Sequence, residues 1–162
     1  LGCHLVDIVY MMCGEPEEII PLNISTNNDG INSLDYGFAV FRYSNGLSFV
    51  KACASEVNGF DRRQIVVTGT RGSFVIQPIE ERTGGPDVEE FAKAHVTFCD
   101  EGSKHRFEKA GADIKFGPFG RYTEMMLDFA EIVRGKRENK YSYDYELAVQ
   151  RILLKACGNF NN

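Results

Sequence analysis

Hydrophobic residues recur every three or four positions in three segments, one at the start of the chain and two near its end. This spacing is that of an amphipathic helix and predicts a first helix over residues 4–13. A second helix is expected after Pro118, with Gly135 ending it, and a third from Asp144 as its N-cap to Gly158. The apolar positions are Leu5, Val6, Ile8, Val9 and Met12 in the first helix, Tyr122, Met125, Met126, Phe129, Ile132 and Val133 in the second, and Leu147, Ala148, Ile152 and Leu153 in the third.

Between the first and second helices the hydrophobic period changes to two, which is typical of strands. The clearest pair of strands flanks Ser44-Asn45-Gly46, a sequence that favours a tight hairpin turn. A further strand is expected between residues 17 and 28, and the acidic segment 80–90 is expected to be an exposed loop. The predicted hairpins pair 36–43 with 47–54, 64–68 with 73–77, and 95–99 with 104–108.

The order of these elements predicts an α+β fold for a single domain over residues 1–162. One helix is followed by about six strands and then two helices. We therefore expect an open, mostly antiparallel sheet with the helices packed on one face. A dinucleotide-binding domain instead alternates strands with helices and opens with a G-x-G-x-x-G turn. The sequence has neither feature, so we assign no cofactor-binding residue to it.

The charge of the chain argues against nucleic acid or an anionic membrane as a partner. Its formal net charge is -5, and its only basic cluster consists of Arg134, Lys136 and Arg137. These residues follow the second predicted helix, where cations stabilise the negative end of the helix dipole. We expect the partner to be a small solute or another protein.

The cysteines and the absence of a long apolar segment predict a cytoplasmic protein. Five dispersed cysteines without a C-x-x-C pair are typical of reduced thiols. No apolar run reaches the roughly 20 residues that span a bilayer. The chain begins at Leu1, without Met and directly with a helical pattern, so we expect this start to lie inside a longer protein. The cysteines are Cys3, Cys13, Cys53, Cys99 and Cys157.

The best candidates for acid–base chemistry are His4 and Asp7. Three residues apart on a helix, they share a face, and a histidine beside a carboxylate can act as a general acid or base near neutral pH. The same spacing also suits a helix start, where Asp7 would stabilise the positive end of the dipole. A metal site would need His95 or His105 to converge on this pair from a distant segment, so we assign no metal ligand.

Six short motifs, taken together and in order, resemble the C-terminal domain of the glucose-fructose oxidoreductase, inositol dehydrogenase and MocA family. Each motif is only moderately specific, but their order and spacing agree over nearly all of the chain. The motifs are Gly2-Cys3-His4-Leu5-Val6-Asp7, Gly14-Glu15-Pro16, Ser44-Asn45-Gly46, Val67-Thr68-Gly69-Thr70-Arg71-Gly72, Met126-x-x-Phe129 and Tyr143-x-x-Glu146-Leu147-Ala148.

The resemblance implies that the chain is the substrate side of a two-domain dehydrogenase. In this family an N-terminal Rossmann domain binds NAD or NADP, and that domain is absent from this chain. The C-terminal domain has a dihydrodipicolinate-reductase-like fold, and the open face of its sheet makes homo-oligomer contacts. The implied reaction oxidises a CH–OH group of a sugar, a polyol or a related compound.

The resemblance also implies roles for two residues. His4 takes the position of the catalytic histidine, which exchanges the hydroxyl proton. Asp7, one turn along, would contact substrate or orient that histidine. The family's catalytic Asp falls just before Leu1 and its catalytic Lys in the N-terminal domain, so we expect the isolated chain to be inactive. The alternatives are a non-catalytic ligand-binding or assembly module and, third, a metal-dependent hydrolase.

Overall fold

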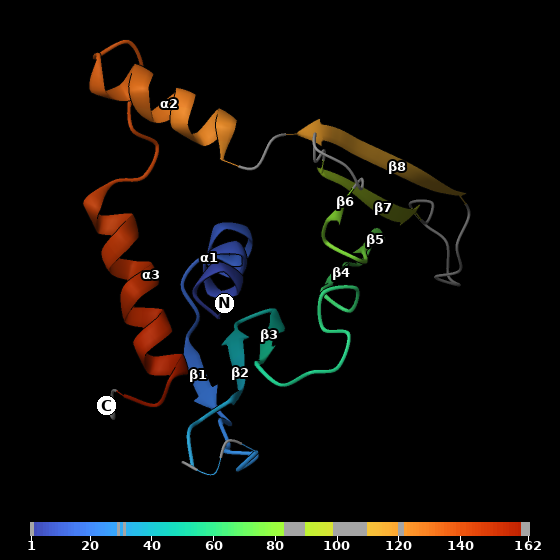
Figure 1. Ribbon diagram of the computed structural model, residues 1–162, viewed down its shortest axis with the longest axis vertical. Coiled ribbons are helices and arrows are strands. Elements are labelled where there is room, and N and C mark those ends of the chain that lie inside the picture. Colours follow the sequence, from blue (N-terminus) through green and yellow to red (C-terminus); the bar gives the residue numbers. More distant parts are fainter. Residues whose placement is uncertain are drawn as a thin grey trace. The chain divides into compact units, whose positions relative to one another are not determined.

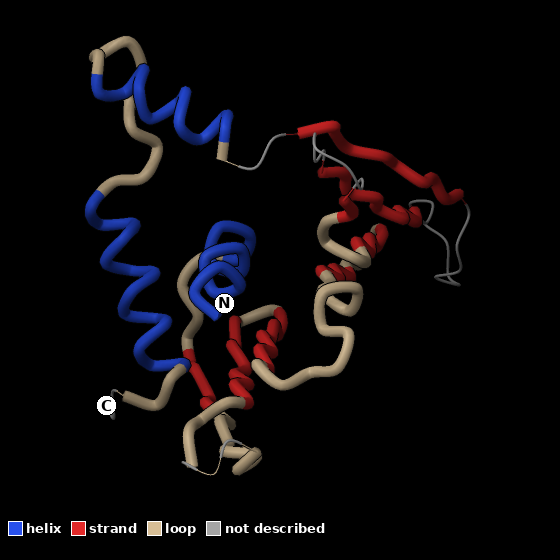
Figure 2. The backbone as a smooth tube through the Cα atoms, in the orientation of Figure 1, coloured by secondary structure: helices blue, strands red, loops and turns tan. Residues whose placement is uncertain are grey.

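The computed structural model describes residues 2–28, 30, 32–82, 90–98, 110–119 and 122–159, which form two compact units. Unit 1 combines Leu1–Val57 with Asn139–Asn162, and unit 2 consists of Asn58–Glu138. Figure 1 shows the elements, and Figure 2 separates helices from strands by colour. In chain order they are α1 (Gly2–Cys13), β1 (Glu18–Pro21), β2 (Tyr36–Tyr43), β3 (Gly46–Cys53), β4 (Ile65–Thr68), β5 (Gly72–Ile76), β6 (Glu81–Arg82), β7 (Glu90–Phe98), β8 (Ala110–Phe119), α2 (Thr123–Val133) and α3 (Tyr143–Ala156).

Unit 1 is built on a three-stranded antiparallel sheet in the order β1-β2-β3. The predicted hairpin is confirmed: Tyr43 pairs with Gly46, so two residues form the turn between β2 and β3. β1 pairs with the other edge of β2, with Ile19 opposite Phe41. Because side chains alternate along a strand, Ala39, Phe41 and Ile19 lie on one face of this sheet.

The helices α1 and α3 cover that face and close the core of unit 1 (Figure 1). Phe41 has no exposed surface, and Val6 of α1 is only 2% exposed. From α3, Ile152 and Ala156 pack into the same cluster. A side-chain amide adds a polar tie, since Asn23 Nδ2 donates to the Ala156 carbonyl at 2.8 Å. The first and last segments of the chain thus share one hydrophobic core.

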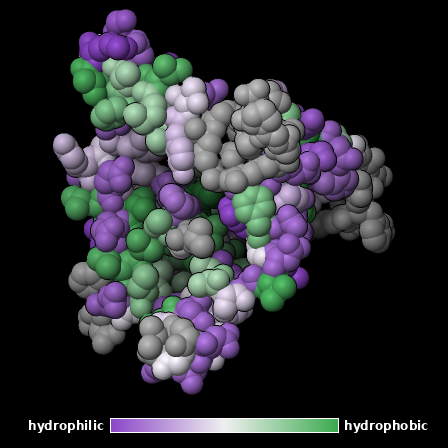
Figure 3. All heavy atoms as spheres, in the orientation of Figure 1, coloured by the Kyte–Doolittle hydropathy of each residue, from purple (hydrophilic) through white to green (hydrophobic). Residues whose placement is uncertain are grey.

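Unit 2 contains a five-stranded antiparallel sheet and the helix α2. β7 is its central strand: Ala94 pairs with Ile76 of β5 on one side and with Ile114 of β8 on the other. β4 and β5 form the second predicted hairpin, which is confirmed. Along α2, hydrophobic side chains remain at the surface (Figure 3), and Met125 and Phe129 are each 59% exposed.

The predicted α+β class with antiparallel strands is confirmed. The strands, however, divide into a three-stranded and a five-stranded sheet, where the sequence predicted one sheet of about six strands. Two details were also wrong. The N-cap of α3 is Ser142 rather than Asp144, because the Ser142 hydroxyl accepts the Tyr145 backbone N–H. β7 starts at Glu90, five residues before the predicted start.

The third predicted hairpin is replaced by the pairing of β7 with β8. The expected second strand, 104–108, lies outside the described residues, and β8 was missed because Gly111, Gly117 and Pro118 interrupt its pattern. Within the acidic segment 80–90, Glu81–Arg82 pairs with β7 as β6, and 83–89 lie outside the described residues. Among the helices of the described chain, none has the length and hydropathy of a bilayer-spanning segment.

Candidate active site

An open groove of about 310 Å³ lies within unit 1 along α1 and α3. One wall comes from the first two turns of α1, and the other comes from Tyr141 and from α3 between Tyr145 and Leu153. Both predicted site residues are in its lining, so the structure brings His4 and Asp7 to one surface. The lining consists of Cys3, His4, Asp7, Tyr141, Tyr145, Glu146, Val149, Gln150 and Leu153.

The helical period explains why this wall is polar while α1 is anchored in the core. Val6 faces the sheet and is buried, whereas His4 and Asp7, three residues apart, share the face toward the groove. His4 is exposed and Asp7 is half-buried. An exposed imidazole on a packed helix can exchange protons with a bound ligand without a change in the fold.

Tyr145 ties the two walls of the groove together. Its hydroxyl donates to Asp7 Oδ1 at 2.5 Å, across 138 positions of the sequence. Its ring contacts those of Tyr10 and Tyr141, with centroids 5.2 and 5.5 Å away and tilted planes. The Ser142 hydroxyl, which caps α3, accepts the backbone N–H of Tyr145 itself. Two contacts from α1 and one from Tyr141 therefore fix this side chain.

The carboxylate acceptor has an electrostatic effect on Tyr145. The hydrogen bond to Asp7, together with smaller contributions from burial and from the Asp7 charge, raises the pKa of Tyr145 to about 12. Deprotonation would remove the donor and place two negative charges side by side. The hydroxyl therefore stays protonated at physiological pH and keeps donating to Asp7.

We expect the titration of Tyr145 to reveal this hydrogen bond in solution. In a titration followed by tyrosinate absorbance, the difference between wild type and Tyr145→Phe should have its midpoint near the pKa of about 12. In an Asp7→Asn background the midpoint should fall toward the ordinary value of 10.0. Because the folded-state pKa is raised, the stability that this bond provides is complete below about pH 10 and is lost as the pH rises through about 12.

The matched control for this titration is Tyr141→Phe, which removes a hydroxyl from the same groove but not the one bonded to Asp7. The titration curve of this variant should still contain the tyrosine component with the highest pKa. A difference curve for Tyr145→Phe centred near 10 would show that the bond to Asp7 does not form.

The structure gives Asp7 a partner that the sequence did not indicate. Within the described residues Asp7 is bonded to Tyr145, and His4 makes no hydrogen bond to a carboxylate. Tyr145 was missed although it lies inside the Tyr143-x-x-Glu146 motif. An aromatic residue at one position of a helix gives no sign of a partner so distant in sequence. Glu146 and Gln150, one turn apart on α3, were missed as lining residues for the same reason.

The other histidines offer no metal cluster in the described part of the chain. His95 lies on β7 in unit 2, where its Nδ1 is 2.7 Å from Asp113 Oδ1 of the neighbouring strand. His105 lies outside the described residues. The described strands pair only antiparallel, so these residues form no parallel strand-helix-strand cradle for a dinucleotide.

Comparison with protein families gives a match for the N-terminal part of the chain. Residues 1–75 match the model described as the GFO/IDH/MocA C-terminal domain. This segment includes all of α1, with His4 and Asp7, and the strands β1 to β4. Over this segment the resemblance drawn from the sequence motifs is confirmed. A search of curated proteins found no match.

Two solved structures share the fold over 98% of this chain. One is a "putative oxidoreductase" from Klebsiella pneumoniae, with a TM-score of 0.64 and 19% sequence identity. The other, from Yersinia pestis and described in the same words, has a TM-score of 0.62 and 17% identity. The chain spans 45% and 46% of these two proteins, which is less than half of each.

Proposed function

We propose that this chain is the C-terminal, substrate-side domain of an NAD(P)-dependent oxidoreductase that acts on a CH–OH group of a sugar, polyol or related compound. The observation that carries this proposal is the groove, in which an exposed histidine stands beside a carboxylate held by a tyrosine. The family match over residues 1–75, which contains both His4 and Asp7, supports it.

In the proposed reaction His4 is the acid–base group. Oxidation of a carbinol removes a hydride from carbon and a proton from oxygen as the C=O bond forms. The imidazole of His4 accepts the hydroxyl proton, and in the reverse direction it returns the proton to the alkoxide. Asp7, held in place by Tyr145, accepts a hydrogen bond from a substrate hydroxyl and fixes the orientation of the substrate.

The nicotinamide cofactor, when bound, supplies the hydride acceptor. The described residues of this chain form no cradle for it, so we place its binding site in an N-terminal Rossmann domain of the intact protein. The contribution of this chain is then the wall that binds the substrate and holds the proton-transfer group. The isolated chain is expected to lack turnover.

The intact protein tests this proposal directly. Supplied with NAD or NADP and a panel of sugars and polyols, it should reduce the cofactor with at least one of them, and the rate should depend on His4. Protein that binds a panel compound without any cofactor reduction would instead favour the non-catalytic ligand-binding module.

We further propose that the outer face of the unit 1 sheet joins two copies of this chain. Ile20, Val40 and Phe49 lie opposite one another across the three strands, on the face away from the helices. Phe49 is 66% exposed and stacks on Phe38 with centroids 5.5 Å apart. An apolar row of this kind on an antiparallel sheet suits a two-fold interface, in which the same patch serves both partners.

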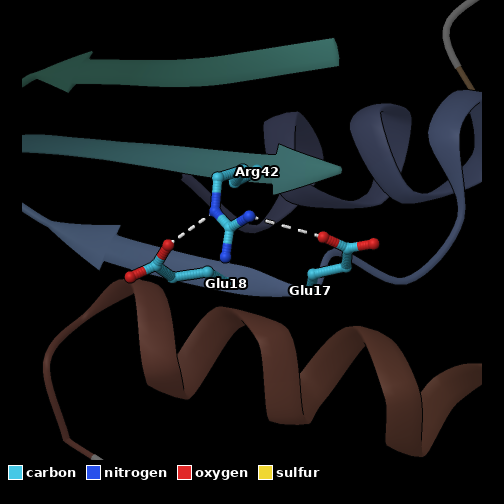
Figure 4. A network of polar contacts seen from close by, with 3 residues as sticks. All are labelled: Glu17, Glu18 and Arg42. Carbon is cyan, nitrogen blue, oxygen red and sulfur yellow. Dashed lines mark hydrogen bonds and ion pairs between the residues drawn. The ribbon is translucent and has the colours of Figure 1, made fainter. Parts of the chain in front are cut away.

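Charged residues beside this row neutralise one another. Arg42 on β2 contacts Glu18 at 2.7 Å and Glu17 at 3.5 Å (Figure 4). On the other side, Lys51 contacts Glu56 at 3.1 Å. Because these charges are already paired, association need not bury an unpaired ion, which would be costly.

We expect Phe49→Glu to weaken this association about tenfold or more, since it puts a charge into the apolar row that each partner contributes. Sedimentation equilibrium over a range of concentrations would measure the change. Tyr143→Glu is the matched control, because Tyr143 is 90% exposed on α3 and does not lie on the sheet. A wild-type chain that stays monomeric at high concentration would refute the interface.

A further inference from the structure

The charged side chains that line the groove, His4 aside, are carboxylates. Asp7 and Glu146 both line it, and among the described lining residues there is no lysine or arginine. The cations of α3 lie elsewhere: Arg151 and Lys155 line a second groove of unit 1, where Arg151 contacts Glu15 at 3.0 Å. On α3, the acidic Glu146 thus faces the first groove, and the basic Arg151 and Lys155 face the second.

The groove also holds several hydrogen-bond acceptors beside the donors of His4, Tyr141 and Gln150. Since the Tyr145 hydroxyl donates its proton to Asp7, its remaining capacity is that of an acceptor. The second oxygen of Asp7, the carboxylate of Glu146 and the amide oxygen of Gln150 add further acceptors. A ligand that satisfies this lining must both donate and accept hydrogen bonds, as hydroxyl groups do.

We propose that this groove selects uncharged, hydroxyl-rich compounds and rejects their anionic relatives, such as sugar acids and sugar phosphates. This inference rests on the proposed function, which it narrows from sugars and polyols in general to neutral ones. A carboxylate or phosphate group in the groove would face two like charges, and the described lining residues include no lysine or arginine to pair with it.

The sign of the electrostatic potential in the groove can be measured on the 162-residue chain, without any catalytic turnover. The probes are two nitroxides of the same ring system, one carrying an ammonium group and the other a carboxylate. At low ionic strength and a pH at which free imidazole is neutral, relaxation of the His4 ring protons should be enhanced severalfold more by the cationic nitroxide.

Charge-removal variants make this measurement specific to the groove. Glu146→Gln should reduce the difference between the relaxation enhancements that the two nitroxides cause at His4. Glu17→Gln is the matched control, because Glu17 lines the second groove and its removal should change the His4 signal little. Equal enhancement by both nitroxides, or a larger effect of the anionic one, would overturn the inference whatever the protein catalyses.

In the intact protein, kcat/KM for a neutral sugar should exceed that for the matching uronic acid by about tenfold or more, as expected for two like charges near a solvated ligand. Glu146→Gln should narrow this ratio, and a wild-type ratio near one would overturn the inference. A groove that attracts the cationic nitroxide in a protein that oxidises no polyol would instead refute the proposed dehydrogenase function.

Discussion

Replacing His4 by Asn in the intact protein should lower kcat by about 10²–10⁴-fold, the usual contribution of a positioned acid–base group. Asparagine preserves polarity and hydrogen bonding but cannot accept the hydroxyl proton. Because His4 is exposed and takes no part in the hydrophobic core, the fold should survive the change. Steady-state kinetics on the best substrate, with unfolding curves measured in parallel, would check both expectations.

The matched control is His95→Asn, which makes the same substitution on β7 in unit 2. Its kcat should remain within a few-fold of wild type. The pH profile of kcat separates a proton-transfer role from a structural one. Only the loss of a proton-transfer group should remove the limb of this profile that reports an imidazole. A His4→Asn protein with normal turnover would remove His4 from the proposed mechanism.

Phe41→Ala should lower the free energy of unfolding of unit 1 by about 3–5 kcal/mol, the usual cost of deleting a buried aromatic ring. Phe41 is 0% exposed and packs in the cluster that contains Val6 and Ile152. The lost ring leaves a cavity that α1, α3 and the sheet cannot all close at once. A loss of this size is a large part of the stability of a small domain, so much of the variant is expected to be unfolded.

Urea unfolding followed by circular dichroism would measure this loss. Phe129→Ala on α2 is the control, because the same ring is removed from a side chain that is 59% exposed, and its effect should stay near or below about 1 kcal/mol. If the two variants lost the same stability, Phe41 would not be at the centre of the core of unit 1.

Local sequence patterns predicted the parts of the fold that are set by residues close to one another in the chain. The turn Ser44-Asn45 between β2 and β3 needs only two residues and the alternation on either side, and both can be read from the sequence. The helix α1 similarly follows from its period and from Gly14, whose φ of 75° only glycine adopts readily. β8 was missed because its glycines and proline obscure the alternation. Its place in the sheet depends on pairing along β7, which lies earlier in the chain.

The candidate site was predicted only in part, because one of its contacts joins segments that are distant in sequence. His4 and Asp7 lie on one helix, so their spacing alone places them on one face. The hydrogen bond of Asp7 to Tyr145 depends on how α3 packs against α1, which no local pattern specifies. The division of the strands into two sheets is likewise a property of long-range contacts.

The two-part construction of unit 1 has a consequence for the order of events during synthesis. Unit 2 occupies 58–138, so it emerges from the ribosome between the two segments that complete the core of unit 1. Until α3 has been made, Val6 and Phe41 lack Ile152, and Asp7 lacks Tyr145. Unit 2 can therefore fold first, while the apolar face of α1 remains open to chaperones or to misfolding. The groove that carries His4 is among the last features of the chain to form.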